Sequence, residues 1–233
     1  MGGFVEMTFD TFAKTFRRPF QFREFLDQTW MIARVSLVPT LLISIPFTVL
    51  VAFTLNILLR EIGAADLSGS GTAFGTVTQL GPVSTVLVVA GAGATAICAD
   101  LGARTIREEI DAMRVLGIDP IQRLVVPRVL ASTVVAMLLN GFVILIGLSG
   151  GGYVFSVLLQ GVNPGAFISG LTILTGGLGE LIISEVKAVL FGVMAGLVGC
   201  YRGLTVKGGP KGVGEAVNET VIYASSACSS STC

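Results

Sequence analysis

The residues best suited to chemistry or binding are the charged side chains of one segment, residues 100–128. This segment holds five of the chain's 15 Lys and Arg residues and five of its 15 Asp and Glu residues, and strongly apolar segments lie on both sides. Opposite charges four residues apart face each other on a helix. Two such pairs are present: Arg104 with Glu108, and Arg107 with Asp111. Surface pairs of this kind are suited to contact a partner and seldom form a reaction centre.

No constellation typical of an enzyme accompanies these charges. The chain has no histidine, which removes the commonest general base and metal ligand. It has no Ser/His/Asp set, no HExxH motif and no nucleotide-binding loop. The four cysteines lack metal-binding or redox spacing, and Cys98 and Cys200 are expected to be packing residues. We therefore expect no catalytic residue, no metal and no cofactor.

Residues 105–116 predict one short amphipathic helix that carries the charges. Gly117 is expected to end it, and Asp119-Pro120 to turn the chain. The apolar side chains recur at i, i+4 and i+7, which places them on one face: Ile106, Ile110 and Met113. The charged side chains form the rest of the surface: Arg107, Glu108, Glu109, Asp111 and Arg114. Such a helix is either a docking surface or a solvated loop helix.

The composition predicts an all-α integral membrane protein. The chain is 52% hydrophobic and only 13% charged, with a mean hydropathy of +0.84, whereas soluble domains carry roughly 25% charged residues. Four apolar runs are long enough to span a bilayer: residues 37–59, 82–99, 129–160 and 182–201. The formal net charge of zero indicates no nucleic-acid partner.

The remaining segments are expected to lie outside the bilayer core. Residues 1–36 mix aromatic and basic side chains, which predicts an amphipathic interfacial helix, and no signal peptide is expected there. Residues 60–81 are rich in Gly, Ser and Thr and predict a connection that is too polar to span. Residues 222–233 are mostly Ser and Cys and too few to cross a bilayer. Prolines 39 and 46 predict a kink in the first span, and Gly150-Gly151-Gly152 a bend in the third.

The distribution of basic residues predicts the orientation. Thirteen of the 15 lie in residues 1–36, 100–128 and 202–211, and the other two are Arg60 and Lys187. Because basic residues accumulate on the cytoplasmic side, the N-terminus and the charged segment 100–128 are both expected in the cytoplasm.

Lys187 is the notable ionisable residue inside an apolar run. It lies near the start of the fourth span, two helical turns after Glu180. A charge at membrane depth lines a cavity or pairs with another charge, but a lysine near a helix end also extends to the headgroups. The residues favour neither alternative.

Two stretches closely resemble the MlaE/YrbE permease family. They are QLGPVSTVLVVAGAGATAICADLGARTIREEIDAMRVLGIDPIQRLVVPRVLA, residues 79–131, and KAVLFGVMAGLVGCYRGLTVKGGPKGVGEAVNETV, residues 187–221. The likeness covers residues 37–221, and the sequence of these stretches is similar to that of actinobacterial YrbE proteins that accompany Mce proteins.

The resemblance implies a permease subunit of an ABC-type lipid transporter in the bacterial plasma membrane. Two permeases, here a heterodimer of YrbE-type paralogues, would form the core above cytoplasmic ATPases, with MCE-domain proteins outside. It makes residues 105–116 the coupling helix that contacts the ATPase. It places lipid in a cavity lined by part of residues 41–55 and by the following residues: Leu80, Gly81, Pro82, Glu180 and Lys187.

The chain departs from the family pattern at two places. Gln79 stands where many members have an acidic residue before the LGP motif. The family continues after the position of Val221 into a fifth span, whereas this chain continues into Ala-Ser-Ser-Ala-Cys, so four spans are expected. A non-transporting membrane scaffold of the same assembly is the alternative. The related systems suggest fatty acids, mycolic acids or sterols as substrates, and no residue here selects among them.

Overall fold

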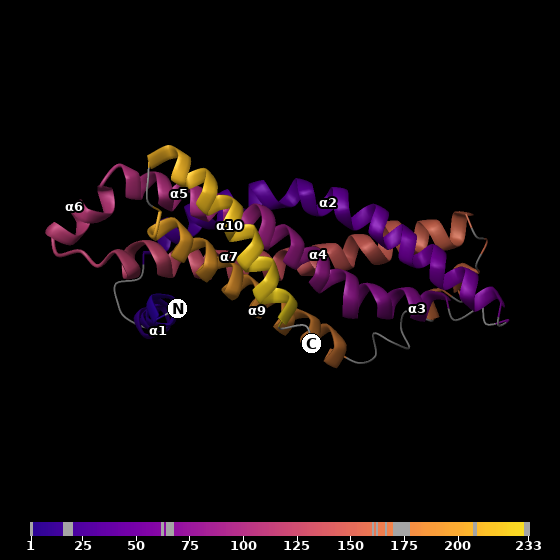
Figure 1. The fold of residues 1–233 in the computed structure, drawn as a ribbon. Coiled ribbons are helices and arrows are strands. Elements are labelled where there is room, and N and C mark those ends of the chain that lie inside the picture. The colour runs from indigo at the N-terminus through magenta and orange to yellow at the C-terminus, as the bar shows by residue number, and fades with distance from the viewer. Residues whose placement is uncertain are drawn as a thin grey trace. The chain divides into compact units, whose positions relative to one another are not determined.

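The regular structure of this chain is entirely helical wherever it is described, which confirms the expected all-α class (Figure 1). A computed structural model describes residues 2–15, 21–61, 63, 68–159, 161, 163–165, 167–169, 178–206 and 209–230. Four of the helical runs are long and apolar enough to cross a membrane: Phe22–Leu59, Gly69–Ile106, Ile121–Leu158 and Gly179–Leu204.

The first span begins much earlier than expected. Helix α1 (Gly2–Thr15) is separate, but α2 (Phe22–Glu61) runs for 40 residues and has no helix boundary between residues 36 and 37. No Gly or Pro precedes Pro39 within α2, and its apolar side chains continue at helical spacing, so nothing ends the helix there. The assigned helix also continues through both prolines.

The second span also begins early, because most of the expected connection 60–81 is helical. Helix α3 (Ser68–Gly75) leads through η2 (Thr76–Leu80) into α4 (Gly81–Val88). Hydroxyl side chains in this stretch donate to their own helix, as Thr78 does to the Phe74 carbonyl at 2.7 Å. Such bonds satisfy the hydroxyls without water, so a Thr-rich segment that reads as polar is compatible with a span.

Wide π-helical turns interrupt the spans in several places. They are η2, η3 (Val89–Gly93), η4 (Ile121–Val125) and η5 (Gly147–Leu159). The three consecutive glycines at 150–152 lie inside η5, so the helix continues there and the assigned structure has no break at the expected bend. At Asn163, the side-chain Oδ1 atom accepts a hydrogen bond from the Gly165 N–H at 3.0 Å.

The last two helices complete the described chain. Helix α9 (Leu178–Leu204) carries Glu180 in its first turn and Arg202 in its last turn, a charge distribution that suits the helix dipole. Residues 170–177, just before it, lie outside the described residues. Helix α10 (Gly209–Ser230) continues through residue 221 without a break and is not among the four candidate spans.

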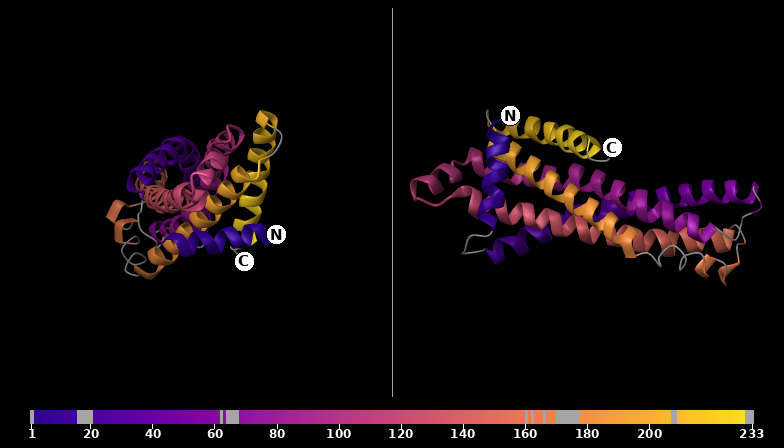
Figure 2. Two further views of the ribbon diagram at one scale, coloured as in Figure 1. Left: turned by 90° about the vertical axis from the view of Figure 1, so that its left-hand side faces the viewer. Right: turned by 90° about the horizontal axis from the view of Figure 1, so that it is seen from below.

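The chain divides into two compact units, the first built from three segments and the second from two. Unit 1 contains residues 1–36, 86–136 and 189–233, and unit 2 contains residues 37–85 and 137–188. In unit 1, α10 lies along α5 (Ala94–Ile106), and α1 contacts η4 (Figures 1 and 2). In unit 2, α3 packs on η2 and η5.

A row of glycines on α9 lets helices approach closely within unit 1. A Cβ atom added to Gly192 would lie 2.9 Å from the Thr133 Cα, and one on Gly199 would lie 2.7 Å from the Ala94 carbonyl oxygen. Gly203 likewise lies against Cys98 and Leu101. Small residues allow such packing in lipid. Cys98 and Cys200 are free and buried between these helices, which confirms their expected packing role.

The glycine row generates a stability prediction. We expect Gly199→Ala to lower the free energy of unfolding by about 1–3 kcal/mol, because its Cβ would collide with backbone rather than with a movable side chain. Gly91→Ala is the matched control, since nothing lies within 4 Å of its Cβ position, and it should be neutral or stabilising. Unfolding in detergent micelles measures both, and equal effects would contradict the close approach.

Candidate functional site

The charged segment forms a short helix set apart from the span before it. Helix α5 ends at Ile106, and α6 (Glu109–Val115) begins after Glu108, whose φ of +58° is left-handed. The single helix expected over residues 105–116 is therefore wrong. A left-handed non-glycine residue costs on the order of 1 kcal/mol, so the break is held by the surrounding structure.

The end of α6 follows the prediction closely. Gly117 has a φ of +72°, and its N–H bonds to the Arg114 carbonyl at 3.0 Å. The Ile118 N–H bonds to the Met113 carbonyl at 2.9 Å, which completes a Schellman motif. Asp119 then accepts from the Ile121 N–H at 3.0 Å and starts η4.

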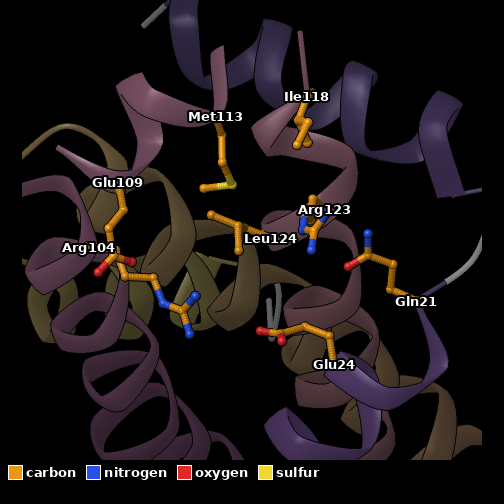
Figure 3. Close-up of a pocket in the computed structure, with 8 residues that line it drawn as sticks. All are labelled: Gln21, Glu24, Arg104, Glu109, Met113, Ile118, Arg123 and Leu124. Atoms are coloured by element: carbon orange, nitrogen blue, oxygen red, sulfur yellow. The ribbon is translucent and has the colours of Figure 1, made fainter. Parts of the chain in front are cut away.

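The break in the helix divides the expected docking residues into two groups. The exposed ones are Ile106, Glu108, Asp111 and Arg114, and Val115 and Leu116 beyond them are 87% and 74% exposed. Ile110 is only 4% exposed. Figure 3 shows Glu109 and Met113 of α6 directed into a pocket that α2, α5 and η4 also line. Ile106 therefore does not share a face with Ile110 and Met113.

The ion pairs of the segment differ from the expected ones for the same reason. Arg107 pairs with Glu109 at 3.8 Å rather than with Asp111, because the register changes at Glu108. Asp111 instead pairs with Arg114 at 2.9 Å. Arg104 pairs with Asp100, one turn earlier, at 3.5 Å. The pairs on α6 are exposed and each contributes less than about 1 kcal/mol.

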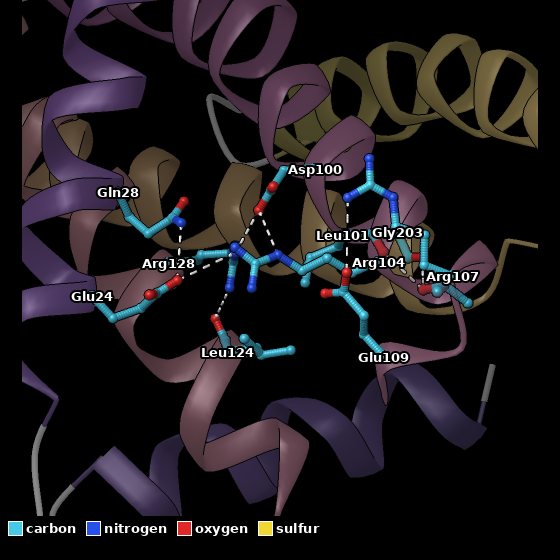
Figure 4. A network of polar contacts seen from close by, with 11 residues as sticks. Glu24, Gln28, Asp100, Leu101, Arg104, Arg107, Glu109, Leu124, Arg128 and Gly203 are labelled. Atoms are coloured by element: carbon cyan, nitrogen blue, oxygen red, sulfur yellow. Dashed lines mark hydrogen bonds and ion pairs between the residues drawn. The ribbon is translucent and has the colours of Figure 1, made fainter. Parts of the chain in front are cut away.

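A fully buried guanidinium lies at the base of this segment (Figure 4). The side chain of Arg128, in α7 (Val126–Ile146), has 0% exposure. It donates to Asp100 of α5 at 2.5 Å and to the Leu124 carbonyl at 2.9 Å, and it lies 3.5 Å from Glu24 of α2. Gln28 also donates to Glu24, at 3.1 Å. Arg128 thus joins three helices, and sequence reasoning missed it.

Helix α1 is tied to the loop that follows α6. Lys14 lies 2.5 Å from Asp119. Burial alone would lower the pKa of Lys14, but the hydrogen bond and charge of Asp119 outweigh it and raise that pKa. Burial alone would raise the pKa of Asp119, but Lys14 and the Ile121 N–H outweigh it and lower that pKa.

A second polar cluster lies within unit 2, around the GP pair. Leu80 is 5% exposed, and Gly81 and Pro82 are buried. A Cβ atom on Gly81 would lie 2.7 Å from the Asn140 Oδ1 atom, so only glycine permits this approach. The three residues therefore form a tightly packed wall at the η2–α4 junction.

Asn140 links this wall to α9 within unit 2. Its Nδ2 atom donates to the Ser184 hydroxyl at 3.1 Å and to Glu185 Oε1 at 3.2 Å. The Asn140 Oδ1 and Glu185 Oε2 atoms are buried and accept no hydrogen bond from the described residues. Buried polar atoms normally have partners, so this cluster departs from ordinary packing at membrane depth. The lone polar Asn140 in an apolar run was the available signal.

Glu180 and Lys187 lie on α9 but do not pair with each other. Both side chains are half-buried, and among the ion pairs of the described residues none involves either one. The charge of Lys187 is therefore uncompensated within this part of the chain.

The family described as "Permease MlaE" matches residues 25–231 of the chain. The chain belongs to the MlaE permease family. The match begins before residue 37 and continues past residue 221, so it is wider than the stretch quoted from the sequence. It includes α6, the Arg128 network and the Asn140 cluster.

Individual relatives are similar over most of this chain. A probable ABC transporter permease of Synechocystis sp. is 36% identical over 160 residues, 69% of this chain and 60% of the relative. The intermembrane phospholipid transport system permease MlaE of Haemophilus influenzae is 28% identical over 169 residues, 72% and 64% of the two chains. The chloroplastic protein TRIGALACTOSYLDIACYLGLYCEROL 1 of Arabidopsis thaliana is 30% identical over 174 residues, 73% and 49%. The chain thus spans about half to two-thirds of the length of these relatives.

The buried network generates a second prediction. We expect Arg128→Met to lower the free energy of unfolding by about 3–5 kcal/mol, because it leaves two carboxylates without their buried partner. Arg114→Met removes an exposed arginine of an ion pair and should cost less than about 1 kcal/mol. Unfolding of both variants in detergent measures the difference, and equal stability of the two would show that Arg128 does not hold the three helices together.

The pair Lys14–Asp119 generates a pH prediction, measured as the difference in unfolding free energy between wild type and Asp119→Asn. Because the pKa of Asp119 is lowered in the folded state, its contribution to the free energy of unfolding is complete above its ordinary pKa of 3.8. That contribution disappears as the pH falls through the lower pKa of the folded state. The raised pKa of Lys14 makes its contribution complete below its ordinary 10.5, and this is lost as the pH rises through the higher folded value. The difference should be below about 1 kcal/mol and flat between those limits. A difference unchanged in strong acid would contradict this assignment.

Proposed function

We propose that this chain is a permease subunit of an ATP-driven, ABC-type lipid transporter of the Mce kind in the bacterial plasma membrane. The subunit itself does not hydrolyse ATP. Family membership and four candidate spans support this proposal. The observation that carries it is α6, a helix between the second and third spans whose end exposes Val115 and Leu116 almost completely.

Helix α6 has the properties of a docking element. Exposed apolar side chains beside charges are typical of protein interfaces, and a solvated loop helix gains nothing from exposing Val115 and Leu116. The exposed charges Glu108, Asp111 and Arg114 surround them. The partner we propose is a cytoplasmic ATPase, which would bind this side of α6 while the N-terminus also lies in the cytoplasm.

The buried network supports a coupling role for this surface. Residues 107–108 are the only break between α5 and α6, and Arg128 holds α5 to α2 and α7 behind them. A displacement of α6 would therefore reach three spans together. ATP binding by the partner would shift the populations of permease states that differ in lipid affinity.

The lipid-binding residues we propose are Leu80, Gly81, Pro82, Glu180 and Lys187. An uncompensated charge inside a span needs a counter-charge or water, and the phosphate of a lipid would supply one to Lys187. The printed name of the Haemophilus influenzae relative refers to phospholipid transport, which supports lipid as the substrate class. The partners would be a second, YrbE-type permease, forming a heterodimer, and MCE-domain proteins outside the membrane.

The coupling experiment compares two exposed glutamates. We expect Glu108→Lys to reduce co-purification of the ATPase roughly tenfold or more, as for residues at the centre of an interface. Glu215→Lys, an exposed charge reversal on α10, is the control and should leave co-purification unchanged. Leu116→Asp should act like Glu108→Lys. Unchanged association of the ATPase with both α6 variants would refute the docking role.

A second measurement separates transport from a scaffold role. We would measure lipid retained by the purified complex of wild type and of Lys187→Met. A transporter should retain lipid, and the variant should retain less. A complex that assembles normally but holds no lipid would favour the scaffold alternative.

A further inference from the structure

A pocket of about 320 Å³ lies inside unit 1, behind α6 (Figure 3). Arg104 of α5, Glu109 and Met113 of α6, Arg123 and Leu124 of η4, and Glu24 of α2 line it. In Figure 3 the charged side chains converge on this space from different elements. The pocket therefore joins the docking helix to the ends of two spans.

The acidic side chains of the pocket already have partners. Glu24 receives hydrogen bonds or charge from Gln28 at 3.1 Å and Arg128 at 3.5 Å. Glu109 pairs with Arg107 at 3.8 Å. Neither carboxylate therefore needs a cation from outside the protein.

The two arginines that line the pocket are less fully paired than its two glutamates. Arg123 lines the pocket, is exposed, and forms no side-chain hydrogen bond or ion pair with the described residues. Arg104 has a single long contact, 3.5 Å, with Asp100, which Arg128 already holds at 2.5 Å. A guanidinium that lines a pocket without a counter-charge is available to bind an anion, and its planar fork matches a phosphate group.

The apolar side of the pocket restricts the kind of anion. Met113 and Leu124 are lining residues that would contact hydrocarbon beside the phosphate. An inorganic ion would leave these side chains against water, whereas the glycerol and first acyl carbons of a lipid would cover them. The lining thus suits an amphipathic phosphate ester.

Neighbouring side chains place the pocket near the headgroup level of a membrane. Phe22, Leu26 and Trp30 follow one face of α2 at i, i+4 and i+8, and they are 62%, 49% and 72% exposed. Exposed aromatic residues on a helix that continues into a span are typical of the membrane interface. Glu24 lies in the same turns, so a lipid headgroup would reach the pocket from the adjacent leaflet.

We propose that this pocket binds the phosphate of an anionic phospholipid from the leaflet on the α6 side, with Arg123 and Arg104 as its ligands. Basic pockets between spans on the cytoplasmic side are suited to such headgroups. The bound lipid would contact α2, η4 and α6 together and would hold α6 in place. This site lies in unit 1, whereas Leu80, Gly81 and Pro82 of the proposed transport cavity lie in unit 2. The proposal therefore does not depend on transport.

The test measures lipid bound to the full purified chain by native mass spectrometry. The probe is phosphatidylglycerol, and the comparison is diacylglycerol with the same acyl chains, which lacks only the headgroup phosphate. We expect phosphatidylglycerol to bind at least tenfold more tightly. Arg123→Gln should remove this preference, and Arg123→Lys should restore part of it. Arg23→Gln is the matched control, because Arg23 is exposed beside the lining residue Glu24 on α2 but does not itself line the pocket.

Several outcomes would overturn the proposal. These are equal retention of both lipids by wild type, full retention of phosphatidylglycerol by Arg123→Gln, or an equal loss with Arg23→Gln. Binding of glycerol phosphate as tight as that of phosphatidylglycerol would instead identify an aqueous anion site. If Arg123→Gln does not fold, Met113→Trp, which fills the pocket from α6, should abolish binding while the charges remain. Retention of the lipid preference by that variant would also refute the site.

Discussion

A guanidinium that no water reaches must be neutralised by carboxylates within a few ångströms, and this requirement determines where three helices of unit 1 meet. Arg128 brings Asp100 of α5 and Glu24 of α2 to the start of α7. The same guanidinium also holds the Leu124 carbonyl of η4. Helix α6 connects α5 to η4, so its position depends on the buried charge of Arg128, which it does not contact.

Unit 1 thus combines tightly packed spans with a helix, α6, that has few buried contacts. The glycine row of α9 packs backbone against backbone, and such contacts leave little freedom for the spans. Helix α6 buries only Ile110 completely and is otherwise held by its Schellman end and by exposed ion pairs. A segment with few buried contacts opens at low free energy, which suits a surface that must respond to a partner.

The all-α membrane class could be predicted from the sequence, because the length of an apolar run is enough to identify a span. The end of α6 could be predicted from Gly117. The predicted span boundaries were wrong where a segment of polar composition is nevertheless helical and buried. Threonines 72 and 76 are fully buried although they read as a polar connection. The break at Glu108 was missed because a left-handed glutamate has no local signature and is imposed by tertiary contacts. Arg128 was missed for the same reason, since its partners Asp100 and Glu24 are distant along the chain.

The π-helical turns carry a consequence for how this protein tolerates change in length. A π turn closes its hydrogen bond over five residues instead of four, so each such turn accommodates one residue more than an α turn. Removing one residue inside η3 would tighten that turn to an α turn, and the flanking helices would keep their facing residues. The same deletion within the α-helical part of α9 would rotate every later glycine away from its neighbour. Insertions and deletions between related chains should therefore accumulate at η2, η3, η4 and η5 and avoid the glycine row.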